Sequence, residues 1–144
     1  MSTYFQGAVK SGDGFSEVPS GVGVGTAEFV QTTLINFNAT LVSEATFVLP
    51  KDAQIIDIIP DVLTAFDSAT SATLTVGSAS AGTQYAGAVN AKTAGRAAIT
   101  YSAAQLAAMD DIDGNTTVYA TITSVGQPTA GQVRVTVRYT GGSL

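Results

Sequence analysis

Two groups of acidic residues have a spacing that could support chemistry. The segment 111–115, Asp-Ile-Asp-Gly-Asn, matches the first three ligand positions of a calcium-binding loop. The loop's sixth position requires glycine but carries Thr116, and its twelfth requires a bidentate acid but carries Ile122. We therefore interpret the segment as a polar turn in which Gly114 has a positive φ.

A second acidic pair, Asp57 and Asp61, flanks Pro60 within an apolar run. Two neighbouring carboxylates can act as the acid and base of a glycoside hydrolase. The apolar context instead favours carboxylates that face the outer side of a sheet or a subunit boundary. Arg134 and Arg138 share a strand face but are too far apart to clamp one anion, so we expect them to pair with acids on a neighbouring strand or subunit.

The composition excludes several kinds of catalytic site. The chain of 144 residues contains neither histidine nor cysteine. Zinc sites built from those residues and Ser-His or Cys-His nucleophiles are therefore excluded, and no redox compartment can be inferred. The glycines of segment 21–25 lack the lysine and the strand–loop–helix frame of a phosphate-binding loop. We predict that the protein is not an enzyme and uses no cofactor and no metal.

Charge and hydropathy also limit the partners. The net charge is −5 and the six basic residues are scattered, so nucleic acid is not an expected partner. No apolar run approaches the roughly 20 residues that span a bilayer, and no signal peptide is evident, so we expect no membrane partner. Only 12% of residues are charged, and a surface rich in threonine is suited to strands and to packing against other protein.

The remaining pattern predicts an all-β fold. The stretch 49–77 is typical of strands joined by short turns, and 116–125 and 132–140 alternate apolar and polar residues. Residues 84–89 suggest a further short strand, and 126–131 a hairpin-like turn. Many short strands with one helix predict a jelly-roll-like β-sandwich. Its core should include six residues: Phe47, Ile55, Leu74, Val118, Val135 and Val137.

Two segments are less regular. Residues 102–109 predict the one helix, because Ser102 and Gln105 form a capping box, and we expect Leu106 and Met109 to pin it on the sheet. Phe29 to Phe37 is strand-like, but its apolar residues do not share one face.

The glycine-rich residues 1–26 predict an extended arm preceding a β-sandwich domain of residues 27–144. The aromatic residues of the arm are Tyr4, Phe5 and Phe15. Ordering the arm costs on the order of 25–50 kcal/mol, whereas burying its apolar side chains returns roughly 10–20 kcal/mol. We therefore expect the arm to be mobile in the free protein and ordered only on a partner.

Several segments resemble the small virion proteins of tailed bacteriophages. The resemblance is carried by Leu49-Pro50-x-x-Ala53-x-Ile55-x-Asp57, Ala65-Phe66, Ala72-Thr73-Leu74-Thr75-Val76-Gly77, Thr117-Val118-Tyr119-Ala120-Thr121 and Ala130-Gly131-x-Val133-Arg134-Val135-Thr136-Val137-x-Tyr139. It covers roughly residues 45 to 140 and leaves out the arm. Such proteins are jelly-roll-like modules that decorate or cement capsids, commonly as trimers, and they have no catalytic residues to carry over.

The resemblance implies a non-enzymatic decoration or cement protein of the capsid surface, made in the cytoplasm of the bacterial host. Its partners would be the major capsid protein and itself, as a homotrimer, with Tyr4, Phe5 and Phe15 as the arm's anchors on the particle. The alternative is a receptor- or glycan-binding module of a head fibre or tail. Sugar binding favours exposed aromatic clusters, and the absence of tryptophan and the small number of tyrosines count against it.

Overall fold

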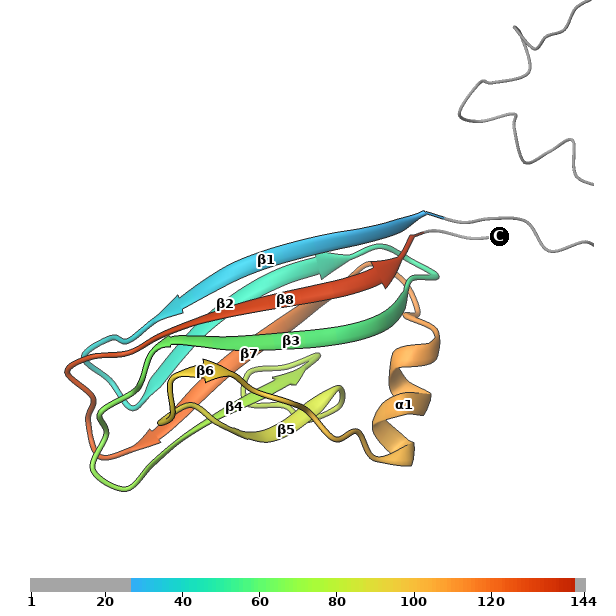
Figure 1. The fold of residues 1–144 in the computed structure, drawn as a ribbon. Coiled ribbons are helices and arrows are strands. Elements are labelled where there is room, and N and C mark those ends of the chain that lie inside the picture. Colours follow the sequence, from blue (N-terminus) through green and yellow to red (C-terminus); the bar gives the residue numbers. More distant parts are fainter. Residues whose placement is uncertain (1–26, 142–144) are drawn as a thin grey trace, which may run out of the picture.

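Two four-stranded antiparallel sheets form a β-sandwich in the computed structural model, which describes residues 27–141 (Figure 1). The first sheet contains β1 (Glu28–Asn36), β8 (Gln132–Thr140), β3 (Gln54–Thr64) and β6 (Gly95–Arg96), in that order. The second contains β2 (Val42–Leu49), β7 (Thr116–Val125), β4 (Ser71–Gly77) and β5 (Ala86–Asn90). This is the strand order of an eight-stranded jelly roll, so the predicted fold class is confirmed.

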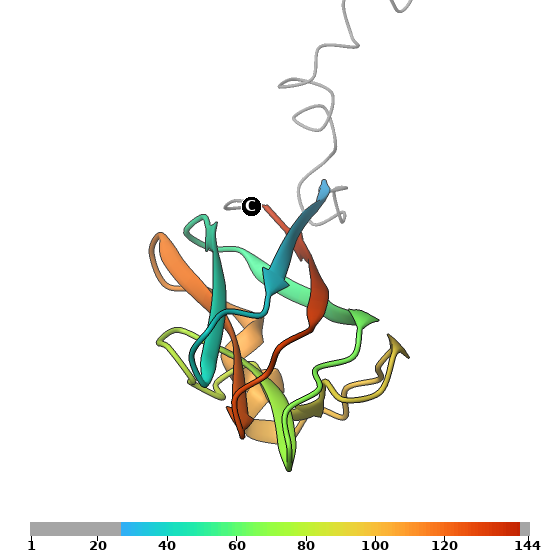
Figure 2. The ribbon, with the colours of Figure 1, turned by 90° about the vertical axis from the view of Figure 1, so that its left-hand side faces the viewer.

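The two sheets face each other in the end-on view (Figure 2), and the buried core residues lie between them. All six predicted core residues are buried: Phe47, Ile55, Leu74, Val118, Val135 and Val137. They come from five strands, because alternate side chains of each strand point inward. The period-2 pattern of the sequence therefore identified the inner face correctly.

Strand β3 runs through Pro60 without a turn. The Pro60 carbonyl accepts a hydrogen bond from the Ala97 N–H at 3.0 Å, on the side away from β8. The missing N–H of proline faces this same side, where β6 pairs only with Asp61 and Val62. Proline is tolerated here because the ladder with β8 does not need its N–H.

Helix α1 (Ala103–Asp110) begins with the predicted capping box, which is confirmed. The Gln105 N–H donates to Ser102 Oγ at 3.2 Å, and the Ser102 N–H donates to Gln105 Oε1 at 2.9 Å. Met109 is buried as expected, but the prediction for Leu106 is wrong, because that side chain is 54% exposed. A helix of eight residues buries only a narrow stripe, and Met109 and Ala108 occupy it.

The segment 126–131 is not a hairpin turn, contrary to the prediction, because it joins β7 of one sheet to β8 of the other. Its position is fixed by Asp67 in the β3–β4 connection, which accepts from the Thr129 N–H at 2.7 Å and the Ala130 N–H at 3.1 Å. These bonds and the Thr129 hydroxyl, whose contribution is the largest, lower the pKa of Asp67. Adjacent alternating strands looked like a hairpin because the sequence pattern does not show which sheet a strand joins.

Candidate interaction surface

The two carboxylates that flank Pro60 lie on the outer face of the first sheet, as expected. Asp61 Oδ2 lies 2.6 Å from Nη2 of Arg134, its direct neighbour on β8. Asp57 Oδ1 accepts a hydrogen bond from the Tyr101 hydroxyl at 3.0 Å. Each carboxylate therefore has its own structural partner.

The second arginine of β8 also pairs with a neighbouring strand. Arg138 donates through Nε and Nη2 to the carboxylate of Glu28 on β1, at 3.1–3.2 Å. The prediction of separate cross-strand pairs for Arg134 and Arg138 is thus confirmed within one chain. Exposed pairs of this kind are worth about 0.2–1 kcal/mol each, so they align strands rather than hold the fold together.

Tyr101 closes an otherwise open part of the β3 edge. Its hydroxyl oxygen accepts from the Ile58 N–H at 2.9 Å, while its proton can be shared between Asp57 Oδ1 and the Ile58 carbonyl. Partial burial, the largest cause, and the neighbouring Asp57 raise the pKa of Tyr101 to about 12. A neutral tyrosine therefore substitutes for a neighbouring strand where β6 has ended.

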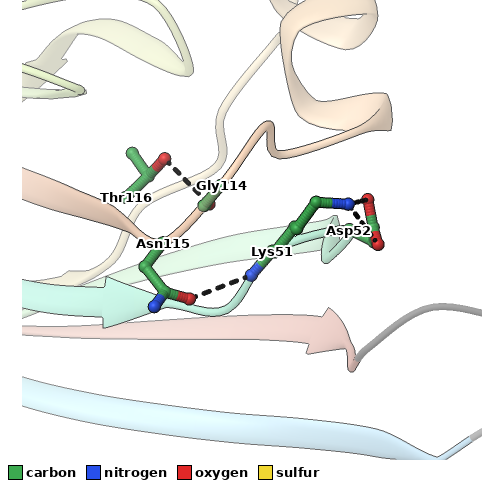
Figure 3. Close-up of polar contacts among 5 residues, drawn as sticks. All are labelled: Lys51, Asp52, Gly114, Asn115 and Thr116. Carbon is green, nitrogen blue, oxygen red and sulfur yellow. Dashed lines mark hydrogen bonds and ion pairs between the residues drawn. The ribbon is translucent and has the colours of Figure 1, made fainter.

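The segment 111–115 is a turn that supports the β2–β3 connection (Figure 3). Gly114 has a φ of +80°, as predicted. The Lys51 N–H donates to Asn115 Oδ1 at 3.2 Å, and Lys51 Nζ contacts both carboxylate oxygens of Asp52 at 2.9 Å. Within residues 27–141, no group of three or more acidic side chains could hold a metal ion.

Exposed apolar side chains are concentrated in β1, β2 and their connection, at one border of the sandwich. Residues 27–141 contain eleven large hydrophobic side chains that are exposed, and seven of them lie between positions 29 and 48. We call these seven the β1–β2 flank: Phe29, Val30, Leu34, Phe37, Leu41, Val42 and Val48. Large apolar patches on a soluble protein mark interaction sites, so this border is the candidate interaction surface.

Strand pairing explains why the flank is exposed. Val30 and Leu34 stand opposite Arg138 and Arg134 of β8, on the outer face of the first sheet. Val42 and Val48 stand on the outer face of the second sheet, in register with threonines of β7. Within residues 27–141, no layer covers the outer faces at these four positions, so their side chains are exposed.

Phe29 is directed toward the inner side but lies at the end of the sandwich. Its ring packs against Tyr139, with ring centroids 5.8 Å apart, and remains 47% exposed. A β-carbon at Gly141 would lie 2.3 Å from Phe29 Cε2, so the ring position depends on the glycine. The flank thus combines outward-pointing aliphatic residues with an aromatic ring that packs against Tyr139 and Gly141.

The edges of the two sheets approach each other along this flank. Gln31 Nε2 donates to the Val48 carbonyl and to the Tyr139 hydroxyl, each at 2.9 Å, and so joins β1 to β2. Within the described residues, β1 pairs only with β8. A nine-residue edge strand with apolar side chains is an aggregation hazard unless another protein covers it.

The outer face of the second sheet is partly covered by the β4–β5 connection. The Ala81 N–H donates to Thr121 Oγ1 at 3.0 Å, and the Thr121 hydroxyl donates to Glu44 Oε2 at 2.9 Å. Thr121 is fully buried, although it points away from the core. The neighbouring Thr75 Oγ1 is buried without a partner within residues 27–141. The part of this face over β7 and β4 is therefore less accessible than the part at β2, where Val42 and Val48 are exposed.

The predicted anchors Tyr4, Phe5 and Phe15 lie outside the described residues. The β1–β2 flank was not identified from the sequence, although a signal was present. Val30 and Leu34 are out of step with Phe29, Ile35 and Phe37, so the strand is apolar on both faces. One face belongs to the core, and the other is available to a partner.

Comparison with known proteins gives one informative likeness. Neither a protein-family model nor a curated protein sequence matches the chain. A solved structure, described as "Cyanophage Pam1 capsid asymmetric unit", contains a chain that is 26% identical, with a TM-score of 0.58. The match covers 87% of this chain and 92% of that one. The likeness supports a phage structural role associated with the capsid.

No helix within residues 27–141 is long and apolar enough to cross a bilayer.

Proposed function

We propose that this protein is a non-enzymatic structural protein of a tailed phage that decorates and cements the assembled capsid shell. The observation that carries the proposal is the likeness, over most of both chains, to a chain of a cyanophage capsid. The jelly-roll sandwich and the paired outer-face carboxylates fit a binding role, in which surface matters more than a reactive site. Its location is the virion, on the surface of the capsid.

The proposed partners are the major capsid protein and further copies of the same chain, arranged as a homotrimer. Low charge and an exposed apolar flank support self-association, because such surfaces are buried in stable oligomers. A cement protein prefers the assembled lattice to free subunits and so stabilises the shell by mass action. Heating decorated and stripped particles tests this function: stripped particles should release DNA at a lower temperature. Identical release would refute cementing and favour a receptor- or glycan-binding module of a head fibre or tail.

The arm of residues 1–26 is the proposed contact with the shell, with Tyr4, Phe5 and Phe15 as its anchors. A variant lacking residues 1–26 should keep nearly the same melting temperature, because residues 27–141 contain a complete sandwich. It should bind stripped particles much more weakly, as measured by co-sedimentation. Exchanging the three aromatic residues for serine within the full-length chain provides the matched variant. Full-strength binding by both variants would move the contact to the sandwich.

A further inference from the structure

The free edge of β1, at one border of the first sheet, offers backbone groups for a further strand (Figure 1). At the end of the β1–β8 ladder, the Phe37 N–H donates to the Gly131 carbonyl at 3.0 Å. The register of β1 with β8 is unbroken, so the odd-numbered residues of β1 exchange hydrogen bonds with β8. The N–H and carbonyl groups of Val30, Thr32 and Leu34 therefore face the free edge.

This edge lacks the features that protect exposed strands from pairing. Strand β1 contains no proline, its register has no bulge, and its one charged residue, Glu28, stands at the first position and pairs with Arg138. The other edges are less suited to pairing. Strand β6 has two residues, β5 is irregular in register, and the Val48 carbonyl of β2 already accepts from Gln31. A long regular edge of this kind is covered in a native assembly.

The two sides of the β1 edge offer different space to an added strand. On the outer face, Val30 and Leu34 are 57% and 47% exposed. On the inner side, Gln31 Nε2 lies 2.9 Å from the Val48 carbonyl oxygen, so β2 comes close to the edge. An added strand can therefore place apolar side chains on the outer side, where they form cross-strand pairs, but it has little room for side chains on the inner side.

The segment 21–25, which lies outside the described residues, has a matching sequence: Gly-Val-Gly-Val-Gly. Alternate residues of a strand point to the same face, so Val22 and Val24 would share one face and the glycines the other. Valine favours strands and would pair with the apolar side chains of the outer face. Glycine allows the backbone to lie close to β2.

The segment cannot take this position on β1 of its own chain. Residue 27 is already paired with residue 141, so only residues 25 and 26 remain for a reversal of the chain. A two-residue turn would place Val22 and Val24 opposite residues 29 and 27, on the inner side of β1. A longer turn would include Val24 itself. The match with the outer face therefore requires β1 of another copy.

We propose that residues 21–25 of one copy pair with the free edge of β1 in a neighbouring copy, with Val22 and Val24 on the side of Val30 and Leu34. Each copy then donates one segment and receives one, and three such exchanges close a ring. Antiparallel pairing brings the end of the segment to the start of the neighbour's β1, so the three β1 strands start beside the trimer axis.

The inference rests on the self-association in the proposed function and states which segment and which edge produce it. It leaves residues 1–20, with the proposed anchors, available to the shell.

Cysteine cross-linking in the full-length protein tests the exchange, since the chain has no cysteine of its own. Val22→Cys, Thr32→Cys and the double variant are treated with a short bismaleimide. The double variant should form covalent trimers on a denaturing gel, and each single variant should remain monomeric. A double variant that is linked only within its own chain, as intact mass would show, or not linked at all would overturn the inference. Covalent dimers of Thr32→Cys alone would also overturn it, because two β1 edges would then meet.

Proline substitution tests the backbone pairing. The N–H groups of Val22 and Val24 donate to β1 in the proposed arrangement, and proline has no N–H. Val24→Pro should therefore weaken association by at least about tenfold, as measured by analytical ultracentrifugation. Ser11→Pro, outside the segment, is the matched control and should leave association unchanged. Equal association constants for the two variants would contradict the pairing.

Amide hydrogen exchange reports on the edge itself. The amides of Val30, Thr32 and Leu34 should exchange more slowly in the trimer than in the diluted monomer. The amides of Gln31 and Thr33 face β8 and should change little. Val24→Pro should abolish the difference at the even-numbered positions. Equal exchange of those amides in trimer and monomer would refute the covered edge.

The outcomes separate this inference from the proposed function. A trimer mass by light scattering, without a response to proline substitution or cross-linking, would refute the exchanged segment and leave trimerisation intact. A monomer mass at every concentration, with isolated single copies on the particle, would refute both. The heat-release experiment with stripped particles would still decide the cement function.

Discussion

The two flanks of the sandwich differ although one jelly-roll order produces both. The β1–β2 flank is formed by strands of nine and eight residues whose exposed side chains are large and apolar. The border at the other end of the two strand orders, which we call the β5–β6 flank, is formed by strands of five and two residues, with a bulge at Gly87–Ala88 and small side chains. Ala88 also has a φ of +57°, which is uncommon for a residue other than glycine.

The difference shows that the two borders of one sandwich can have unlike surfaces. Long regular edge strands keep side chains in fixed directions, so one flank presents a defined apolar surface. A short, bulged edge ends the ladder early, and Tyr101 then satisfies the backbone of β3. Because consecutive residues of a strand point to opposite faces, substitutions at neighbouring positions can test fold stability and surface contacts separately.

The largest expected effect is a difference in stability between variants of a core residue and of a flank residue in the same strand, β2. Phe47 is 5% exposed and Val48 is 57% exposed, because consecutive residues of β2 point to opposite faces. Phe47→Ala should lower the free energy of unfolding by about 3–5 kcal/mol, as deletion of a buried aromatic side chain does. Val48→Ala should change it by no more than about 0.5 kcal/mol but weaken association. Equal stability of the two variants, measured by urea unfolding, would show that the register of β2 is wrong.

A smaller effect is expected from two glycines. Gly131 has a φ of +154°, and a β-carbon there would lie 2.5 Å from the buried Phe66 ring. Gly95, on the β5–β6 flank, has a φ of +115°, with nothing within 4 Å of its β-carbon position. Gly131→Ala should cost about 1–3 kcal/mol through steric overlap and backbone strain, and Gly95→Ala roughly 1 kcal/mol through backbone strain alone. Thermal unfolding of both variants checks the order, and a larger loss for Gly95→Ala would contradict it.

The smallest effect concerns Tyr101 and appears only in alkaline solution. Its pKa is raised from 10.0 to about 12 in the folded protein, so the folded state holds the phenol proton more tightly than the unfolded chain does. This contribution to stability is complete below pH 10 and is lost as the pH rises through about 12. Urea unfolding between these pH values should show a decline that is weaker in Tyr101→Phe. An identical decline in that variant would assign the effect to other groups.

The sequence predicted the inner face of the sandwich because burial alternates with period 2. Residues 132–140 illustrate this, since Val133, Val135 and Val137 are all buried. It did not show that β3 continues through Pro60. A strand tolerates proline only where the missing N–H faces a side that lacks a pairing partner, and the sequence does not show which side that is. It did not show that 126–131 crosses between sheets, since local patterns carry no information about sheet membership. These errors arise where tertiary pairing decides the outcome.

The candidate surface was less predictable than the fold. The two arginine pairs were anticipated because charges that alternate along a strand need cross-strand partners. The expectation that Leu106 is buried was wrong, because helix propensity does not show how much of a short helix the sheet can cover. A hollow of about 470 Å³ between residues 87–90 and 93–100 could not be predicted, because it depends on a bulge in β5 and on the path of residues 93–100.

A three-dimensional reconstruction of the phage particle tests the central claim most directly, because it shows where the protein lies and what covers each flank. The account predicts trimers of the sandwich on the outer surface of the capsid shell. The β1–β2 flank of each copy should be covered by a neighbouring subunit. Density for the protein only in a tail or fibre, or isolated copies with the β1–β2 flank exposed to solvent, would contradict the account.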